Sequence, residues 1–222
     1  MEPVQRPVIM FDHDGVLVDS FDAFFAAFGA ACRRHGHAEV GTRERFLGLF
    51  EGNFYDSMAA HGVSRGALRA IVDDTTAALD GSPDLRPFPG VPELLRGLAA
   101  RFDVVVITSN AAAVVRDFLA REGLAALVCE VLGIEADPSK VRKIAAVMAR
   151  HPGQVPYFYV GDTSGDMIEG AAAGATPLGA GWGWHGPAAL AAAGAAYVAG
   201  TAADLLAYVL DHAGAPEGAP DR

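Results

Sequence analysis

The stretch VIMFDHDGVLVDS, residues 8–20, decides the fold of this chain. Its four apolar residues at 8–11 predict a short buried strand. Side chains alternate along a strand, so we expect Asp12 and Asp14 on one side and His13 on the other, packed against a cap or a helix. Two carboxylates at the end of a buried strand repel each other strongly, which implies a nearby cation.

The composition limits the classes of function. The chain has 222 residues, of which 51% are hydrophobic and 20% are charged, so it can bury a sizeable core. Its net charge of −10 opposes nucleic-acid binding, because phosphate backbones attract basic surfaces. No signal-peptide pattern or membrane-length apolar run is evident. We expect a cytoplasmic protein, a monomer or homodimer, that binds neither nucleic acid nor membranes.

Further apolar runs of strand length follow, each before a segment with helical periodicity. They lie at residues 104–108, 128–132, 157–160 and 176–179. Strands that are apolar on both faces are typical of a parallel sheet covered by helices. The alternation predicts a doubly wound α/β fold with a Rossmann-like parallel sheet. The helices after the second, third and fourth runs are expected to start near Asn110, Ser139 and Ser164.

The interval between the first two strands breaks this alternation. Phenylalanines recur at helical spacing over residues 21–28, and a second apolar stripe covers residues 68–79. We interpret the phenylalanines as a core stripe that packs helices together, and the turn-rich residues 82–90 as the end of the interval. The prediction is an α-helical cap domain, residues 18–87, inserted after the first strand of a core domain formed by residues 1–17 and 88–222.

The polar residues that follow the strands form the candidate site, because ligands bind beyond the carboxyl ends of the strands in open α/β sheets. They are Asp12 and Asp14, then Thr108, Ser109 and Asn110, then Lys140, and finally Asp162 and Asp166. Converging carboxylates require a hard divalent cation, and oxygen ligands suit Mg²⁺. Hydroxyl groups, the backbone N–H groups at the helix start near Asn110 and the charge of Lys140 would bind an anion beside the metal.

These motifs resemble those of the haloacid dehalogenase superfamily. FDHDGVLVDS is similar to the first motif of that family, ITSN at 107–110 to the second and VGDTSGD at 160–166 to the fourth. PFPGVPELLRGL at 87–98 resembles the segment by which capped members re-enter the core, so the similarity covers essentially the whole chain. The third motif of the family is not matched, because DPSKVRK at 137–143 stands where many relatives have Lys-Pro. Lys140 is favoured over Lys143 as its lysine, being nearer the strand end, but the choice stays open.

The resemblance implies phosphoryl transfer through a covalent intermediate. Asp12 would attack phosphorus to form an aspartyl-phosphate, and Asp14 would protonate the leaving alcohol and then deprotonate water. Mg²⁺ would be held by Asp12, by the backbone carbonyl of Asp14 and by Asp162. Asp166 would support the metal site without binding the ion directly. The phosphoryl oxygens would be bound by Thr108 or Ser109, by the helix start at Asn110, and by Lys140.

The predicted function is therefore a Mg²⁺-dependent phosphatase for a small phosphorylated metabolite, similar to phosphoglycolate phosphatases with helical caps. Asp14 argues against dehalogenation, since dehalogenating relatives usually lack the second aspartate. A sugar phosphomutase or a pyrophosphatase on the same core stays open, as do a phospho-acceptor signalling domain and a catalytically silent binding protein. The candidate substrate contacts in the cap are Arg43, Arg45, Asn53 and Tyr55, which are equally consistent with solvated helix faces. One of the arginines could clamp a substrate carboxylate.

Overall fold

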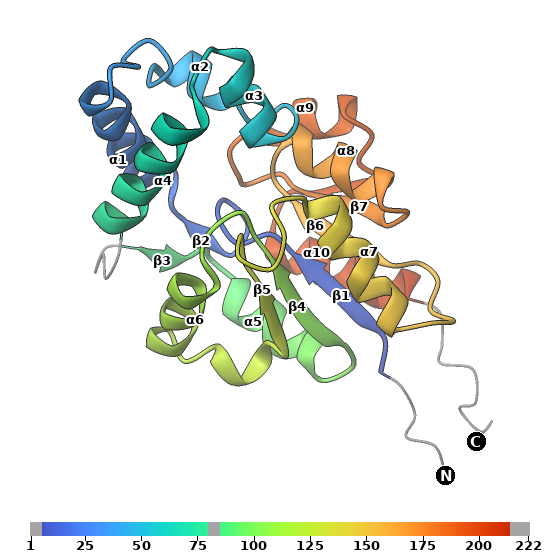
Figure 1. Cartoon of the computed structure of the whole chain (residues 1–222). Helices are drawn as coiled ribbons and strands as arrows, with labels where there is room; N and C mark the ends of the chain where they lie inside the picture. Colours follow the sequence, from blue (N-terminus) through green and yellow to red (C-terminus); the bar gives the residue numbers. More distant parts are fainter. Residues whose placement is uncertain (1–5, 80–84, 214–222) are drawn as a thin grey trace, which may run out of the picture.

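The strand that carries the first motif, β1 (Val8–Phe11), lies at the centre of a parallel sheet (Figure 1). The structure, a computed structural model, describes residues 6–79 and 85–213. Within these ranges six parallel strands follow the order β5-β4-β1-β6-β7-β8. All four residues of β1 are buried, and Phe11 pairs with Val106 on one side and with Val160 on the other. This arrangement confirms the predicted doubly wound α/β fold.

From α5 (Val91–Ala99) onward, helices and strands alternate along the chain. The other sheet strands are β4 (Asp103–Ile107), β5 (Glu130–Leu132), β6 (Phe158–Gly161), β7 (Thr176–Ala180) and β8 (Tyr197–Ala199). The helices of this part are α5 (Val91–Ala99), α6 (Ala112–Arg121), α7 (Lys140–Arg150), α8 (Ser164–Ala172), α9 (Gly186–Ala192) and α10 (Ala202–His212). A short 3-10 helix, Ala125–Leu127, precedes β5.

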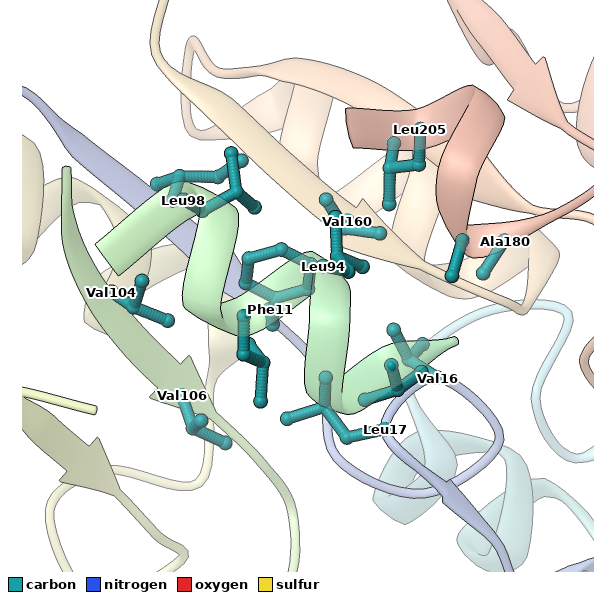
Figure 2. Close-up of a cluster of buried hydrophobic side chains, with 14 of the residues drawn as sticks. Phe11, Val16, Leu17, Leu94, Leu98, Val104, Val106, Val160, Ala180 and Leu205 are labelled. Carbon is teal, nitrogen blue, oxygen red and sulfur yellow. The ribbon is translucent and has the colours of Figure 1, made fainter. Parts of the chain in front are cut away.

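Two apolar layers hold the helices against the two faces of the sheet. Ile9 and Phe11 belong to the larger layer, together with residues of α5, α6 and α10. Figure 2 shows Phe11 in this layer with Leu94 and Leu98 of α5. Val8 and Met10 point into the opposite layer and meet residues of α7. Because the side chains of a strand alternate between faces, a fully apolar β1 serves both layers at once.

The four helices that follow Asp19 and precede Arg86 form a separate group above the carboxyl end of the sheet (Figure 1). They are α1 (Phe21–Arg34), α2 (Arg43–Gly48), α3 (Phe54–Ala60) and α4 (Arg65–Leu79). These helices share an apolar cluster of their own, in which Phe46 is fully buried among Phe28, Met58 and Ile71. We propose residues 18–87 as the limits of this cap. Within the sequence segment predicted as a turn, residues 82–84 lie outside the described residues.

Several local expectations need correction. An antiparallel pair of two-residue strands, β2 (Val18–Asp19) and β3 (Arg86–Pro87), connects the cap to the core and was not predicted. The edge strand β8 was also missed, because its three residues lie in an Ala- and Gly-rich region without a β-branched run. The N-cap of α8 is Thr163, one residue before the expected Ser164, and it forms a capping box with Asp166.

Among the described residues, none of the helices combines the length and the apolar character that crossing a bilayer requires.

Truncation of a buried side chain tests the packing of α5 on the sheet. Leu98 is fully buried in the larger apolar layer, so Leu98→Ala should lower the free energy of unfolding by about 2–5 kcal/mol. The matched control is Ile168→Ala on α8, whose side chain is 50% exposed and whose truncation should change stability by no more than about 0.5 kcal/mol. Urea denaturation monitored by circular dichroism measures both, and equal losses in the two variants would contradict the assignment of this core.

Candidate active site

The candidate site lies where the sheet reverses its winding direction. The chain proceeds from β1 to β4 and β5 on one side, and then returns to β6 on the other side of β1. Asp12 follows the last residue of β1 and Asp162 follows the last residue of β6, so both stand at this switch point. Crevices at switch points are where open α/β sheets bind ligands.

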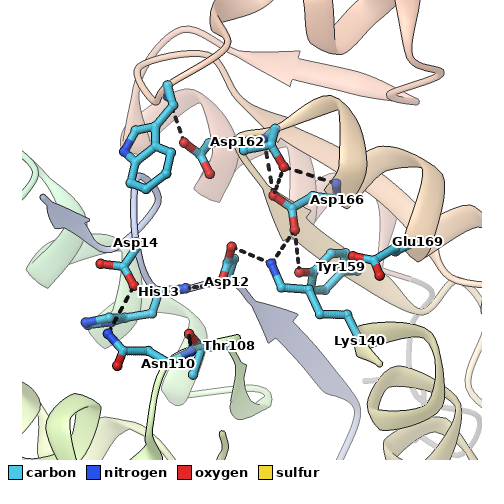
Figure 3. Close-up of polar contacts among 12 residues, drawn as sticks. Asp12, His13, Asp14, Thr108, Asn110, Lys140, Tyr159, Asp162, Asp166 and Glu169 are labelled. Atoms are coloured by element: carbon cyan, nitrogen blue, oxygen red, sulfur yellow. Dashed lines mark hydrogen bonds and ion pairs between the residues drawn. The ribbon is translucent and has the colours of Figure 1, made fainter. Parts of the chain in front are cut away.

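A buried ion-pair network forms the centre of the site. Lys140, the first residue of α7, places its Nζ 2.6 Å from Asp12 Oδ2 and 2.6 Å from Asp166 Oδ1 (Figure 3). The second oxygen of Asp12 accepts a hydrogen bond of 2.7 Å from the backbone N–H of His13. Asp166 also accepts hydrogen bonds from the hydroxyls of Tyr159 and Thr163 at 2.8 and 2.6 Å. Lys140 therefore fixes the positions of both carboxylates.

Among the buried carboxylates of the site, Asp162 has the fewest hydrogen bonds to stabilise its negative charge. It is fully buried, and its Oδ2 accepts a hydrogen bond of 2.7 Å from the backbone N–H of Trp184. Its Oδ1 has no hydrogen-bond partner among the described residues. Gly15 is required beside it, because its backbone has a φ of 76° and a Cβ there would come within 2.0 Å of Asp162 Oδ2.

The surroundings of these three acids shift their pKa values in different directions. Burial raises the pKa of Asp12 to about 7, although Lys140 lowers it. Burial, together with the charges of Asp166 and Asp12, holds the pKa of Asp162 well above its usual range. The pKa of Asp166 is lowered despite burial, because Lys140 and the two hydroxyl donors stabilise its charge. Asp12 and Asp166 share one ammonium and shift in opposite directions, since Asp166 receives two hydroxyl hydrogen bonds and Asp12 receives none.

The donor set fits a hard divalent cation. Oxygen atoms of Asp12, Asp162 and Asp166 lie within 4.8 Å of one another, and all three residues are buried. The unpartnered oxygen of Asp162 and its raised pKa mark a position where a cation would remove an electrostatic cost. Carboxylate oxygens are the ligands that Mg²⁺ favours. Both oxygens of Asp166 already accept side-chain hydrogen bonds, from Lys140 and Tyr159 on Oδ1 and from Thr163 on Oδ2, which leaves Asp12 and Asp162 as the better placed of the three for a metal.

The predicted phosphate-binding segment lies opposite these acids, with one correction. Thr108, Ser109 and Asn110 line the same cavity as Asp12 and Asp14, and Asn110 Nδ2 lies 3.4 Å from Asp14 Oδ2. The backbone N–H groups near Asn110, however, bond to groups of the protein. Their acceptors are Thr108 Oγ1 for Asn110, Asn110 Oδ1 for Ala111 and the carboxylate of Glu135 for Ala112. The expected anion site at this helix start is therefore not available, and Asn110 instead positions Asp14.

The two lysines have different surroundings, and neither lies on the surface. Lys143 Nζ donates to the backbone carbonyls of Thr108 and Gly133 at 2.6 and 3.2 Å, so it joins the loops after β4 and β5. Burial and the charge of Lys140 lower the pKa of Lys143 to about 8. Burial lowers the pKa of Lys140, but the negative charges of Asp12 and Asp166 have the larger combined effect and hold this pKa well above its usual value. Lys140 is the lysine whose ammonium reaches the acids, whereas Lys143 braces the loops.

Of the four candidate cap residues, only Tyr55 lines the cavity between cap and core. Arg43 is exposed, with its guanidinium 4.4 Å from the centre of the Phe21 ring, and Arg45 is exposed as well. Asn53 caps α3 and donates a hydrogen bond of 3.1 Å to Glu169 on α8. The expectation of an arginine clamp in the cap is therefore wrong for these positions.

The loop at residues 181–186 has a larger part in the site than its sequence suggests. Trp184 lines the cavity and contacts Phe24 and Phe50 of the cap, with ring centres 5.6 and 5.0 Å apart. His185 accepts a hydrogen bond of 3.1 Å from the backbone N–H of Ser164 through Nδ1, and its Nε2 lies 3.1 Å from the carbonyl of Leu47 in the cap. The glycine-rich sequence of this loop predicts only a rim of the core, and its aromatic residues are the one signal of a contact with the cap.

His13 behaves as the alternation of side chains predicts. It is 3% exposed and packs edge-on against Phe118 of α6, with ring centres 5.1 Å apart. Burial lowers the pKa of His13, which keeps the ring neutral. It therefore belongs to the packing of the sheet and not to the acidic cluster.

Comparison with known proteins agrees with this geometry. Residues 9–180 match the family model described as haloacid dehalogenase-like hydrolase. The chain belongs to this family of hydrolases, which confirms the resemblance seen in the motifs.

Its relatives narrow the comparison. The chain is 29% identical over 204 residues to a phosphoglycolate phosphatase of Synechococcus elongatus, with 90% of this chain and 96% of the relative covered. It is 28% identical over 221 residues to a phosphoglycolate phosphatase of Vibrio vulnificus, with 91% and 96% covered. Among solved structures, a predicted phosphatase from Clostridium acetobutylicum superposes with a TM-score of 0.79 at 18% identity, covering 93% of this chain and 99% of that one.

Replacement of Asp162 tests the electrostatic cost of the acidic cluster. A raised pKa in the folded state means that stability is lost as pH rises from the unfolded value near 4. Metal-free Asp162→Asn should therefore melt a few degrees higher than wild type at pH 8, because about 1 kcal/mol shifts the melting temperature by about 2–4 °C at this size. The difference should shrink at pH 5. Mg²⁺ should raise the melting temperature of wild type only. Calorimetry measures all three effects, and an equal Mg²⁺ shift in both proteins would contradict this assignment.

Proposed function

We propose that this hydrolase is a phosphatase that cleaves a small phosphomonoester through an aspartyl-phosphate on Asp12. The observation that carries the proposal is the environment of the Asp12 carboxylate, which lies at the end of the central strand and faces a cavity. The backbone N–H of His13 and the ammonium of Lys140 hold its two oxygens. A carboxylate held in this way is oriented as a nucleophile and partly screened from an incoming phosphate dianion.

Asp14 supplies the proton chemistry in this proposal. Its side chain lines the same cavity and lies beside the amide of Asn110, away from Lys140. In the first half-reaction Asp12 attacks phosphorus while Asp14 protonates the departing alcohol oxygen. In the second, Asp14 takes a proton from the water that cleaves the acyl phosphate, which returns Asp12 to its free form. The Asn110 amide holds the Asp14 carboxylate at the side of the cavity from which alcohol and water would approach.

The remaining polar groups of the site stabilise charge. Lys140 and the hydroxyls of Thr108 and Ser109 would hold the phosphoryl oxygens as negative charge develops on them. Mg²⁺ would be bound by Asp12, Asp162 and the backbone carbonyl of Asp14, and it would neutralise phosphate charge that one ammonium cannot balance. Asp166 would keep Lys140 aimed at Asp12 through their shared ion pair.

Hydrolysis is favoured over sugar phosphomutase activity by the lining of the cap. A mutase must hold a sugar phosphate in two orientations, which requires several hydrogen-bond partners for the sugar hydroxyls. The cap side of the cavity consists mainly of aromatic rings, with hydroxyl groups only on Tyr55, Thr75 and Thr76 among the residues described there. The assay that tests the proposal is Mg²⁺-dependent release of inorganic phosphate from a panel of small phosphomonoesters, with EDTA-treated protein as the reference.

Substitution of the two motif aspartates tests their roles. Asp12→Asn removes the nucleophile and should lower kcat by at least about 1,000-fold, whereas Asp14→Asn should lower it by roughly 100- to 10,000-fold. Asp56→Asn changes an exposed residue of α3 and serves as the matched control with unchanged kcat. Phosphate release under saturating substrate measures the effect, with circular dichroism to verify folding. Wild-type turnover by Asp12→Asn would refute the mechanism.

A pair of lysine substitutions separates the two candidates for the third motif. Lys140→Met removes the ammonium that holds Asp12 and should lower kcat by at least about 100-fold. Lys143→Met leaves two buried carbonyl groups without their donor and should lower the free energy of unfolding by about 1–3 kcal/mol with a smaller loss of kcat. Kinetics and urea denaturation on both variants give the comparison. A larger kcat loss in Lys143→Met would reverse the assignment.

A further inference from the structure

The cavity between cap and core has two chemically different ends. The core end carries the acids, Lys140 and the hydroxyl and amide groups that follow β4. The cap end is lined by Phe24, Phe28, Phe50, Phe54, Tyr55, Val72, Thr75, Thr76 and Trp184. A phosphoester bound with its phosphate at Asp12 would place its alcohol portion among these cap residues and Trp184 of the core.

The rings at the cap end form a connected aromatic wall. Phe50 stacks on Phe54 with ring centres 5.3 Å apart and meets the edge of Trp184 at 5.0 Å. Phe24 also packs against Trp184, with ring centres 5.6 Å apart. Such walls bind apolar groups, and aromatic groups best, because ring pairs contribute attraction beyond the area they bury.

The described residues that line this end carry no positive charge. The cap segment 18–87 contains seven arginines, all exposed: Arg33, Arg34, Arg43, Arg45, Arg65, Arg69 and Arg86. Arg34 pairs with Asp74, Arg69 with Asp73, and Arg43 covers the ring of Phe21. In the lining contributed by described residues, Lys140 is the single cationic side chain, and it already holds Asp12 and Asp166.

The polar groups at the cap end are uncharged. Burial raises the pKa of Tyr55 to about 12, so its hydroxyl stays protonated. The Thr75 hydroxyl donates to the carbonyl of Ile71 at 2.7 Å and so offers a ligand only its acceptor electrons. Hydroxyl groups of this kind can accept or donate single hydrogen bonds, but they do not compensate a carboxylate.

We propose that the alcohol portion of the substrate is uncharged and apolar, with an aromatic ring preferred, and that a carboxylate such as that of phosphoglycolate is rejected. This inference rests on the proposed phosphatase function. A carboxylate at the cap end would lose its water and meet aromatic rings without a cation, which is strongly unfavourable. The chain therefore differs in substrate from what the names of its phosphoglycolate phosphatase relatives state.

Three substrates of graded chemistry test this inference. They are phosphoglycolate, isobutyl phosphate, which has a similar shape without the carboxylate, and benzyl phosphate, which adds a ring. All three release an alkyl alcohol, so differences in kcat/KM report mainly on the cap end. We expect kcat/KM to be on the order of 100-fold higher for isobutyl phosphate than for phosphoglycolate, and highest for benzyl phosphate.

A charge introduced into the cavity should reverse the preference. Val72 lies on α4 and lines the cap end, so Val72→Arg should narrow the ratio between isobutyl phosphate and phosphoglycolate by at least about tenfold. Ala78→Arg adds the same charge at an exposed position of the same helix and should leave the ratio unchanged. An equal change in both variants would mean that the charge acts from a distance and would contradict a local subsite.

The outcomes separate this inference from the proposed function. Preference of the wild type for phosphoglycolate over isobutyl phosphate would overturn the inference and leave the phosphatase function intact. Absence of hydrolysis of all three compounds would overturn the phosphatase function. In that case, calorimetric titration with benzylphosphonate and phosphonoacetate in the presence of Mg²⁺ decides the subsite: tighter binding of benzylphosphonate supports it, and tighter binding of phosphonoacetate overturns it.

Discussion

One ammonium group among buried carboxylates is the constraint on which the site depends. Lys140 Nζ lies 2.6 Å from oxygens of both Asp12 and Asp166, and Asp162 stands beside them with an unpartnered oxygen. Three buried acids and one base leave an excess of negative charge that the protein itself does not balance. Burial, and to a smaller extent this excess of negative charge, raise the pKa of Asp12 and Asp162. The excess also explains why a divalent cation and a phosphate suit the site together. Neither would bind as well alone, since the cation offsets the acids and also the charge of the phosphate.

The fold supplies this cluster through the position of its central strand. Because β1 lies between β4 and β6, the loops after these three strands meet at one edge of the sheet. Tight backbone approaches then bring the acids close: a Cβ on Gly15 would come within 2.0 Å of Asp162, and one on Gly183 within 2.3 Å of it. The apolar layers on both sheet faces stabilise this arrangement, so the stability of the core offsets the cost of the acids.

Much of this site can be predicted from the order of residues, for a physical reason. Polar residues that follow apolar strands must meet at the carboxyl edge of a parallel sheet, and this rule places Asp12, Lys140 and Asp162 together. The helix start at Asn110 shows the limit, because only the fold reveals that the carboxylate of Glu135 bonds the backbone N–H of Ala112. Sequence spacing shows which residues share a helix face, but not which charged groups from distant segments fill a helix end.

The same limit applies to the cap. Helical periodicity identifies the phenylalanines of α1 as an apolar face, and Phe28 is indeed buried in the cap cluster. Periodicity does not distinguish a face that packs against other helices from one that lines a cavity, and Phe24 and Phe28 do both. Arg43 shows the reverse case: its charge suits a substrate carboxylate, yet its side chain lies outside the cavity, over the ring of Phe21. Whether a polar residue of a short helix faces in or out depends on how that helix docks, which its own sequence does not determine.

The aromatic wall connects specificity with the docking of the cap on the core. Trp184 comes from the core, whereas Phe24 and Phe50 come from the cap, so the wall exists only when the two are in contact. The backbone carbonyl of Phe50 also accepts a hydrogen bond of 2.9 Å from the N–H of Gly165 at the start of α8. A Cβ at position 165 would approach that carbonyl to 2.8 Å, so glycine permits the close docking. An apolar group that fills the space beside these rings would add contacts to both cap and core, and would therefore stabilise the docking of the cap on the core. A small charged alcohol would make no such contacts, so under the proposed specificity the recognition of the substrate and the docking of the cap on the core would depend on the same side chains.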